Sequence, residues 1–244
     1  RRTVSGASMM APSKPTIGVS IMRAPWSKAR CYRVASMLRV LPNATIIDAQ
    51  RGLGVWHTAK RAWEAATAET THHLVLQDDA ILSARFSDHL AAVLMARPHH
   101  VVSLFTNRTK ALARAMDLRS SWLWAAFCPY GVGVVMPSEW VGAMLDWCAE
   151  HVVEAHPHSD TRVSLWARAS GLGVWTPAPP LLDHGAAPSL LGHTWPKPRL
   201  ALAGGGDIDW SQGLDAPVIA PSKPIPREAL CDPSEVERWP KNRF

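Results

Sequence analysis

Two adjacent carboxylates, Asp78 and Asp79, follow a short apolar run in the first half of the chain. The run from Leu74 to Leu76 is rich in branched residues and too short for a helix, which is typical of a buried strand. Ligands of open α/β sheets bind beyond the carboxyl ends of strands, where neighbouring carboxylates can converge on one cation. The alternative is a helix cap, but a cap needs one aspartate. We therefore expect a metal site at this pair.

Further along the chain, polar residues gather in the run from His156 to Asp160. Ser159 or Asp160 can cap the helix that follows, and such a cap needs neither His156 nor His158. A third position is His184, which ends another short apolar run. A lone histidine is more often structural, but two carboxylates and one imidazole suit Mn²⁺ or Mg²⁺ bound to phosphate oxygens. His184 is therefore a candidate partner of the acid pair.

The elements that must position these residues alternate between strands and helices. Strands are expected over 16–22, 44–48, 74–76, 101–105 and 173–176, and helices over 27–41, 55–67, 87–96, 139–150 and from about 159. Residues 122–127 and 131–136 are predicted as two strands around a turn at 128–130, and the basic segment 107–121 as a solvated helix face. The alternation predicts an α/β fold, with a mostly parallel, Rossmann-like central sheet flanked by helices.

Composition restricts the classes of partner. The 244 residues are 47% hydrophobic and 19% charged, as in a globular protein with a real core. The net charge of +6 is compatible with an anionic partner such as a nucleotide diphosphate or a nucleic acid. Apolar stretches long enough for a membrane span are absent from the sequence, and the four cysteines form no C-x-x-C pair. We expect a cytoplasmic protein with no membrane partner.

In their order, these motifs resemble the small GT-A glycosyltransferases, over about residues 16–199. The resemblance rests on the sequences 76–79 (LQDD), 158–166 (HSDTRVSLW) and 180–185 (PLLDHG). It implies a GT-A-like fold, a nucleotide-sugar donor with UDP-sugars as first choice, and a divalent metal, Mn²⁺ or Mg²⁺. The family's DxD-type motif corresponds to Gln77-Asp78-Asp79, with Gln77 in place of the first acid. The resemblance therefore implies that Asp79 contacts the metal and Asp78 the sugar or ribose.

Other site residues follow from the same resemblance. Asp160 matches the base of inverting members, and His184 matches the histidine that completes the metal site, with His193 as its rival. The nucleotide-binding loop of the family maps onto residues Ile21 to Trp26, which include Arg23. Basic side chains can also contact the diphosphate directly; the candidates are Arg23, Lys28, Arg30, Lys197 and Arg199.

The acceptor is inferred from the charge and the aromatic residues. The positive net charge, the basic segment 107–121 and the 12 tryptophans suit a nucleic acid. A hydroxymethyl-pyrimidine base in DNA, reached by flipping it out of the duplex, is the leading hypothesis for the acceptor. Protein and glycan hydroxyls are the alternatives within the same activity.

Two other classes of function compete with this hypothesis. A metal-dependent phosphoesterase or nuclease would use Asp78, Asp79, His156, His158 and His184 around two metals. A non-catalytic nucleic-acid-binding module would show salt-dependent affinity for DNA without any need for Asp79.

The domain organisation follows from composition. Residues 1–15 are predicted to be a flexible arm, 16–200 the catalytic domain, and 201–244 an irregular, Gly- and Pro-rich C-terminal segment. Asp207 and Asp209 would let this segment act as a lid, although such a stretch is more often a connector.

Overall fold

A central mixed sheet organises the computed structural model, which describes residues 14–127, 130–185, 207–220 and 226–239. The strand order is β10-β6-β8-β5-β7-β3-β1-β2. The strands are β1 Ile17–Arg23, β2 Thr45–Asp48, β3 His72–Gln77, β5 Val101–Ser103, β6 Trp122–Ala125, β7 Gly133–Pro137, β8 Val174–Pro177 and β10 Val218–Ile219. A separate two-stranded sheet pairs β4 (Ala80–Leu82) with β9 (Leu182–His184) in antiparallel fashion.

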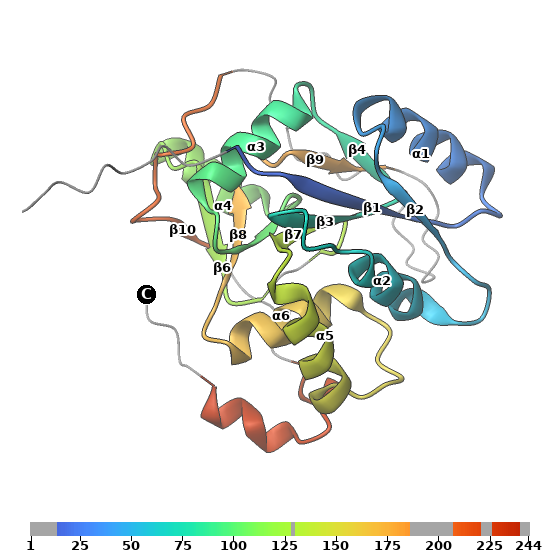
Figure 1. The fold of residues 1–244 in the computed structure, drawn as a ribbon. Helices are drawn as coiled ribbons and strands as arrows, with labels where there is room; N and C mark the ends of the chain where they lie inside the picture. The colour runs from blue at the N-terminus through green and yellow to red at the C-terminus, as the bar shows by residue number, and fades with distance from the viewer. Residues whose placement is uncertain (1–13, 128–129, 186–206, 221–225, 240–244) are drawn as a thin grey trace, which may run out of the picture.

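Helices cover both faces of the sheet (Figure 1). On one face, α1 and α3 pack in one apolar cluster, and on the other α2, α5 and α6 pack in a second cluster. The short α4 packs on β6 and β10. Their bounds are α1 Lys28–Val40, α2 Gly54–Glu64, α3 Phe86–Ala96, α4 Thr109–Asp117, α5 Trp140–His151 and α6 Ser159–Ala169. The chain thus forms the expected α/β architecture, and none of the described helices is both long and apolar enough to cross a bilayer.

Most pairings in the sheet are parallel, as predicted. β1 pairs in parallel with β2 and β3, β5 with β8, and β6 with β10, whereas β7 is antiparallel to β3 and β5, and β6 to β8. Successive side chains of a strand point to opposite faces. In β3, Leu74 and Leu76 therefore enter the cluster on the α1 side, and Val75 enters the cluster on the α2 side. Burial on both faces explains why this strand reads as a continuous apolar run.

The two histidines of β3 are core residues. His72 Nε2 lies 2.9 Å from the carbonyl oxygen of Pro98, and His73 Nε2 lies 2.9 Å from the carbonyl oxygen of Ala62 and 3.1 Å from the hydroxyl of Ser20. Burial lowers the pKa of both imidazoles. Both imidazoles therefore serve to fix the position of β3.

The two strands predicted on either side of residues 128–130 are present as β6 and β7, but they do not pair with each other. β6 pairs with β8 and β10, while β7 is inserted between β3 and β5. The tryptophans explain the placement of β6, because Trp122 packs edge-on against Trp175 of β8, with ring centroids 6.1 Å apart. The short strands β4 and β10 were not predicted from the sequence.

The described residues from 207 onward contact β6 and α3. Trp210 is 5% exposed, its ring lies 6.1 Å from that of Trp122, and its carbonyl accepts a hydrogen bond from Trp122 Nε1 (2.8 Å). Asp207 pairs with Arg85 at the start of α3 (2.7 Å). Further on, two 3₁₀ helices, η1 Arg227–Ala229 and η2 Pro233–Arg238, follow β10. Residues 1–13 of the predicted arm lie outside the described part of the chain.

Candidate functional site

The carboxyl ends of β1, β2 and β3 lie side by side and form the edge on which the candidate site is built. Arg23 of β1 is in register with Asp48 of β2 and forms a two-pronged ion pair with it, Nε–Oδ1 2.6 Å and Nη2–Oδ2 2.8 Å. The hydrogen bond from Arg23 lowers the pKa of Asp48, against a smaller opposing effect of burial. Both side chains are partly exposed, so the pair adds little stability but fixes the end of the sheet.

Asp78 follows β3 directly and is 4% exposed. One of its oxygens, Oδ1, pairs with the guanidinium of Arg30 on α1, and the other, Oδ2, accepts the backbone N–H of Ala24 at 2.7 Å. Burial raises the pKa of Asp78, while the charge of Arg30 opposes the rise. Both oxygens are occupied within the protein. Asp78 therefore ties α1 and the β1–α1 loop to the end of β3, and its contact with a sugar or ribose stays a prediction.

Asp79, 5% exposed, has different surroundings. Its Oδ2 lies 3.2 Å from Nη1 of Arg30 and 3.5 Å from Nε2 of His184. Its Oδ1 is buried without a hydrogen-bond partner among the described residues. A buried carboxylate oxygen without a donor is costly and calls for a cation or a hydrogen-bond donor. Of the two acids, Asp79 is the one with capacity for a ligand.

The pairing of β4 with β9 brings His184 to Asp79. In this small sheet Ala80 is in register with His184, and the backbone N–H of Gly185 donates to the carbonyl of Asp79 (2.8 Å). His184 Nδ1 lies 2.8 Å from the carbonyl oxygen of Gly185, so Nδ1 carries the proton of the neutral ring. This assignment leaves the Nε2 lone pair directed at Asp79, an arrangement that suits a cation held between imidazole and carboxylate.

Asp160 lies at the N-terminus of α6, in its first turn. The expected cap is wrong in detail, because the N-cap residue is His158 and the helix already includes Ser159. The N–H of Thr161 donates to Asp160 Oδ1 (2.8 Å). A Cβ on Gly131 would lie 3.3 Å from both Asp160 Cβ and Gln77 Nε2, so the helix start and the end of β3 meet at this glycine. The sheet edge therefore receives Asp160 from the opposite face to Arg30.

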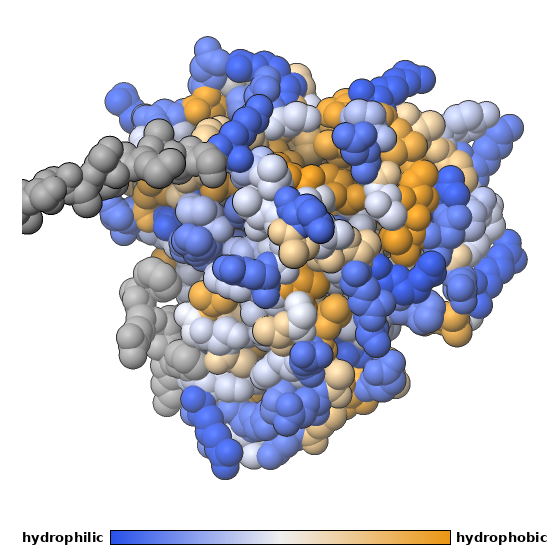
Figure 2. All heavy atoms as spheres, viewed as in Figure 1, coloured by the Kyte–Doolittle hydropathy of each residue, from blue (hydrophilic) through white to orange (hydrophobic). Residues whose placement is uncertain are grey.

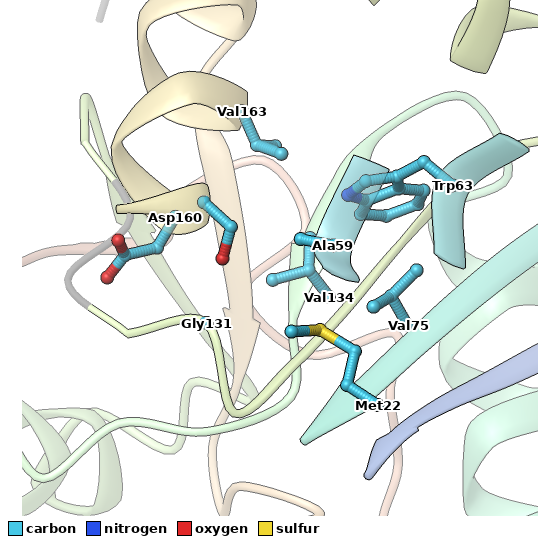
Figure 3. A pocket seen from close by; sticks show the side chains of 9 residues that line it. Met22, Ala59, Trp63, Val75, Gly131, Val134, Asp160 and Val163 are labelled. Carbon is cyan, nitrogen blue, oxygen red and sulfur yellow. The ribbon is translucent and has the colours of Figure 1, made fainter. Parts of the chain in front are cut away.

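Figure 3 shows the small hollow beside Asp160, and the carboxylate of Asp160 points away from Met22, Trp63 and Val75 in it. The hollow measures about 10 Å³, enough for one water molecule and not for a nucleotide. A larger groove of about 420 Å³ lies between α1 and β4, and Ala80, the neighbour of Asp79, lines it together with Arg33. Apolar side chains gather on the surface around β4 (Figure 2). This groove is not lined by Asp78, Asp79 or His184, and it adjoins the acid pair through Ala80.

The other predicted site residues are placed as follows. Ile21 is 0% exposed and packs in the core, so its side chain is not available to a ligand. Trp26 is 40% exposed in the β1–α1 loop, with the guanidinium of Arg51 5.2 Å from its ring centroid. His193, Lys197 and Arg199 lie outside the described residues.

The histidines before α6 do not build the two-metal cluster of the phosphoesterase hypothesis. The rings of His156 and His158 lie edge to face, with centroids 5.5 Å apart. Among the described residues, His, Cys, Asp and Glu side chains nowhere gather in threes around a possible metal position. Together with the occupied oxygens of Asp78, this leaves Asp79 and His184 as the two candidate metal ligands in the described part of the chain.

Arg30 is the site residue whose place sequence reasoning missed. It was a candidate diphosphate contact, but the structure buries it against the acid pair, with 5% of its surface exposed. A signal was present, because Arg30, Val34 and Met37 follow the spacing of one helix face and all three are buried. An arginine on the apolar face of a helix requires a buried acidic partner.

Fold and site define an α/β protein with a carboxylate–imidazole pair at the carboxyl edge of its sheet. Family models and curated proteins give no match to this chain. Among solved structures, one similar fold is the mannosyltransferase PcManGT from Pyrobaculum calidifontis in complex with GDP-Man and Mn²⁺. The identity is 14% and the TM-score 0.43, and the match covers 69% of this chain and 58% of that protein. A similarity at this level carries no argument about function, and the chain spans little more than half of that protein's length.

Proposed function

We propose that the chain is a glycosyltransferase that moves a sugar from a nucleotide-sugar donor to an acceptor hydroxyl. The observation that carries the proposal is the meeting of Asp79 and His184 beyond the end of β3, with Asp79 Oδ1 buried and unpartnered among the described residues. Open α/β sheets bind ligands at this edge. A groove between α1 and β4 begins at Ala80, the residue that follows Asp79.

The residues present fit a divalent cation, Mn²⁺ or Mg²⁺. Asp79 would supply a carboxylate oxygen and His184 its Nε2, and the hydrogen bond of Nδ1 to Gly185 fixes the ring in the required tautomer. When bound, such a cation stabilises the negative charge of the departing diphosphate. Asp78 orients this site by holding α1 and the β1–α1 loop.

The remaining roles follow from position. Asp160 is proposed as the base that accepts the proton of the acceptor hydroxyl, since a carboxylate at a helix start can face a substrate at the sheet edge. Trp26, with Arg23 near it in the sequence, is proposed to contact the nucleotide, with UDP-sugars as the first donors to test. Lys197 and Arg199 are proposed as diphosphate contacts, and His193 as a further ligand. These three residues lie outside the described part of the chain.

For the acceptor, we propose a hydroxymethyl-pyrimidine base in DNA, with protein or glycan hydroxyls as alternatives. The support is the net charge of +6 and the basic residues, which suit a polyanion. Arg33 in the groove and Arg51 over Trp26 place two such cations near the sheet edge.

Thermal-shift measurements with UDP-, GDP- and TDP-sugars, each with and without Mn²⁺, test the donor. A specific donor should raise the melting temperature further when Mn²⁺ is present. Mass spectrometry of hydroxymethyl-cytosine DNA, plain DNA and a protein mixture after incubation with that donor then tests the acceptor. A hexose mass added to the modified DNA alone supports the full proposal. If none of these nucleotide-sugars changes the melting temperature, the proposal that the chain is a glycosyltransferase is overturned.

A further inference from the structure

Arg30 places a positive charge against both acids of the candidate site. Its side chain is 6% exposed, and Nη1 contacts Asp78 Oδ1 as well as Asp79 Oδ2, the latter at 3.2 Å. The residue projects from the buried face of α1, next to Val34 and Met37 in the helix repeat. A permanent cation is therefore built into the site at which a divalent metal is proposed.

The two ion pairs of Arg30 are unequal. Asp78 is held at both oxygens, by Arg30 and by the N–H of Ala24 at 2.7 Å, and its contact with the guanidinium is the closer one. Asp79 is more than a normal hydrogen-bond length from its other neighbour, His184, at 3.5 Å. Its second oxygen has no partner among the described residues. Arg30 belongs to Asp78 first, and its longer contact with Asp79 is the one that can be given up.

We infer that Arg30 is a counter-charge that couples metal binding to donor binding. Without donor, Arg30 neutralises Asp79 and repels a second cation at Asp79 and His184. A donor diphosphate brings negative charge to the same place and offsets this repulsion, so metal and nucleotide bind with positive cooperativity. The inference rests on the proposed metal site and adds its regulation.

The physical basis is charge competition in a buried site. Like charges a few ångströms apart disfavour each other strongly when water is excluded, and all three charged side chains here are at most 8% exposed. Coupling is reciprocal, so the factor by which the nucleotide tightens the metal equals the factor by which the metal tightens the nucleotide.

Mn²⁺ binding followed by electron paramagnetic resonance tests the inference without an activity assay. We compare the wild type with Arg30→Gln, which removes the charge but keeps hydrogen-bonding capacity toward Asp78. In the absence of nucleotide, Arg30→Gln is expected to bind Mn²⁺ about tenfold more tightly, because the repelling charge is gone. UDP, after correction for the Mn²⁺–UDP complex, should tighten Mn²⁺ less in the variant than in the wild type. Arg39→Gln, on the exposed side of α1, is the matched control and should behave as the wild type.

The outcomes separate the two proposals. If the wild type binds Mn²⁺ and Arg30→Gln binds it equally or more weakly, the counter-charge role is wrong while the metal site stands. If neither protein binds millimolar Mn²⁺ with or without UDP, the proposed metal site fails and the inference fails with it.

Circular dichroism checks folding. Should Arg30→Gln not fold, Arg30→Lys replaces it. The shorter lysine side chain keeps a positive charge beside Asp78 but places that charge farther from Asp79. Tighter Mn²⁺ binding is then expected, and an affinity unchanged from the wild type overturns the inference.

Discussion

The imidazole of His184 lies 3.5 Å from the carboxylate of Asp79, although the two residues come from opposite halves of the chain. Two strands of three residues each make this contact, because β4 carries the residue after Asp79 and β9 ends on His184. The proposed metal binding depends directly on this pair.

Asp79→Asn should reduce sugar transfer by at least about 100-fold, because an amide is a poor ligand for a divalent cation and carries no charge. The fold should survive, since Asp78 still pairs with Arg30. Transfer assays and thermal melting measure the two effects. Asp88→Asn, at a site 72% exposed on α3, is the control. Normal transfer by Asp79→Asn would refute the central assignment.

Asp160→Asn should lower the turnover number by about 10²–10⁴-fold while leaving donor binding unchanged. The asparagine side chain still offers an oxygen to the N–H of Thr161, so the helix start is expected to keep its shape. Steady-state kinetics and donor titration provide the readouts, and Glu154→Gln, exposed in the preceding loop, is the control. A loss of donor affinity with unchanged turnover would argue against a role as base.

Arg162→Met should lower the free energy of unfolding by about 3 kcal/mol. The guanidinium is 0% exposed, and Nη2 lies 2.8, 2.9 and 3.1 Å from the carbonyl oxygens of Val153, Glu154 and His156. Without the guanidinium, these three carbonyl oxygens beside the start of α6 lose their hydrogen-bond donor. Urea unfolding measures the change, with the exposed Arg114→Met on α4 as control. Equal stability of both variants would contradict this account.

Acid should destabilise the fold through His100. Burial, with smaller contributions from the charges of Arg97 and His99, lowers the pKa of His100 to about 4 from an ordinary 6.5. Between these values the unfolded chain binds a proton that the folded chain excludes, so stability falls as the pH drops from about 6.5 to about 4. Burial lowers the pKa of His72 and His73 too, with the same sign. Urea unfolding at pH 7.5 and pH 5 should show a smaller loss for His100→Gln, and an identical loss would exclude His100 as a contributor.

Trp210→Ala should loosen the C-terminal segment and cost about 3 kcal/mol, because the ring is buried between His89 and Trp122. Limited proteolysis should then cut near residue 210 much faster than in the wild type. Met116→Ala, at a side chain 71% exposed, serves as the control. If the cleavage rate stays the same, Trp210 is not the anchor of the segment.

Much of the fold could be predicted because its main strands are buried on both faces. The strand from His72 to Gln77 and the helix from Lys28 to Val40 lie within a few residues of their expected bounds. The strands β4 and β10 have three and two residues, too few for any periodicity to show. The placement of β7 between β3 and β5 depends on contacts between distant segments, which local patterns do not contain.

The candidate site was predictable in position and less so in its contacts. A strand end predicts where Asp78 and Asp79 emerge, but not which of them faces α1. Which acid pairs more closely with α1 depends on the rotation of this helix about its axis, because that rotation brings Arg30 to Asp78. His184 was expected as a partner of the acid pair, but the pairing of β4 with β9 that brings it to Asp79 was not, because both strands are too short to be recognised as partners from the sequence.

The pairing of β10 with β6 has a consequence for synthesis. Until residues 218–219 emerge from the ribosome, β6 is an uncovered edge strand, and Leu230 cannot yet bridge to Val152 at the end of α5. A nascent chain that has completed β9 already contains both Asp79 and His184 but still exposes this edge. Until the last part of translation this edge of β6 is therefore open to pairing with another chain.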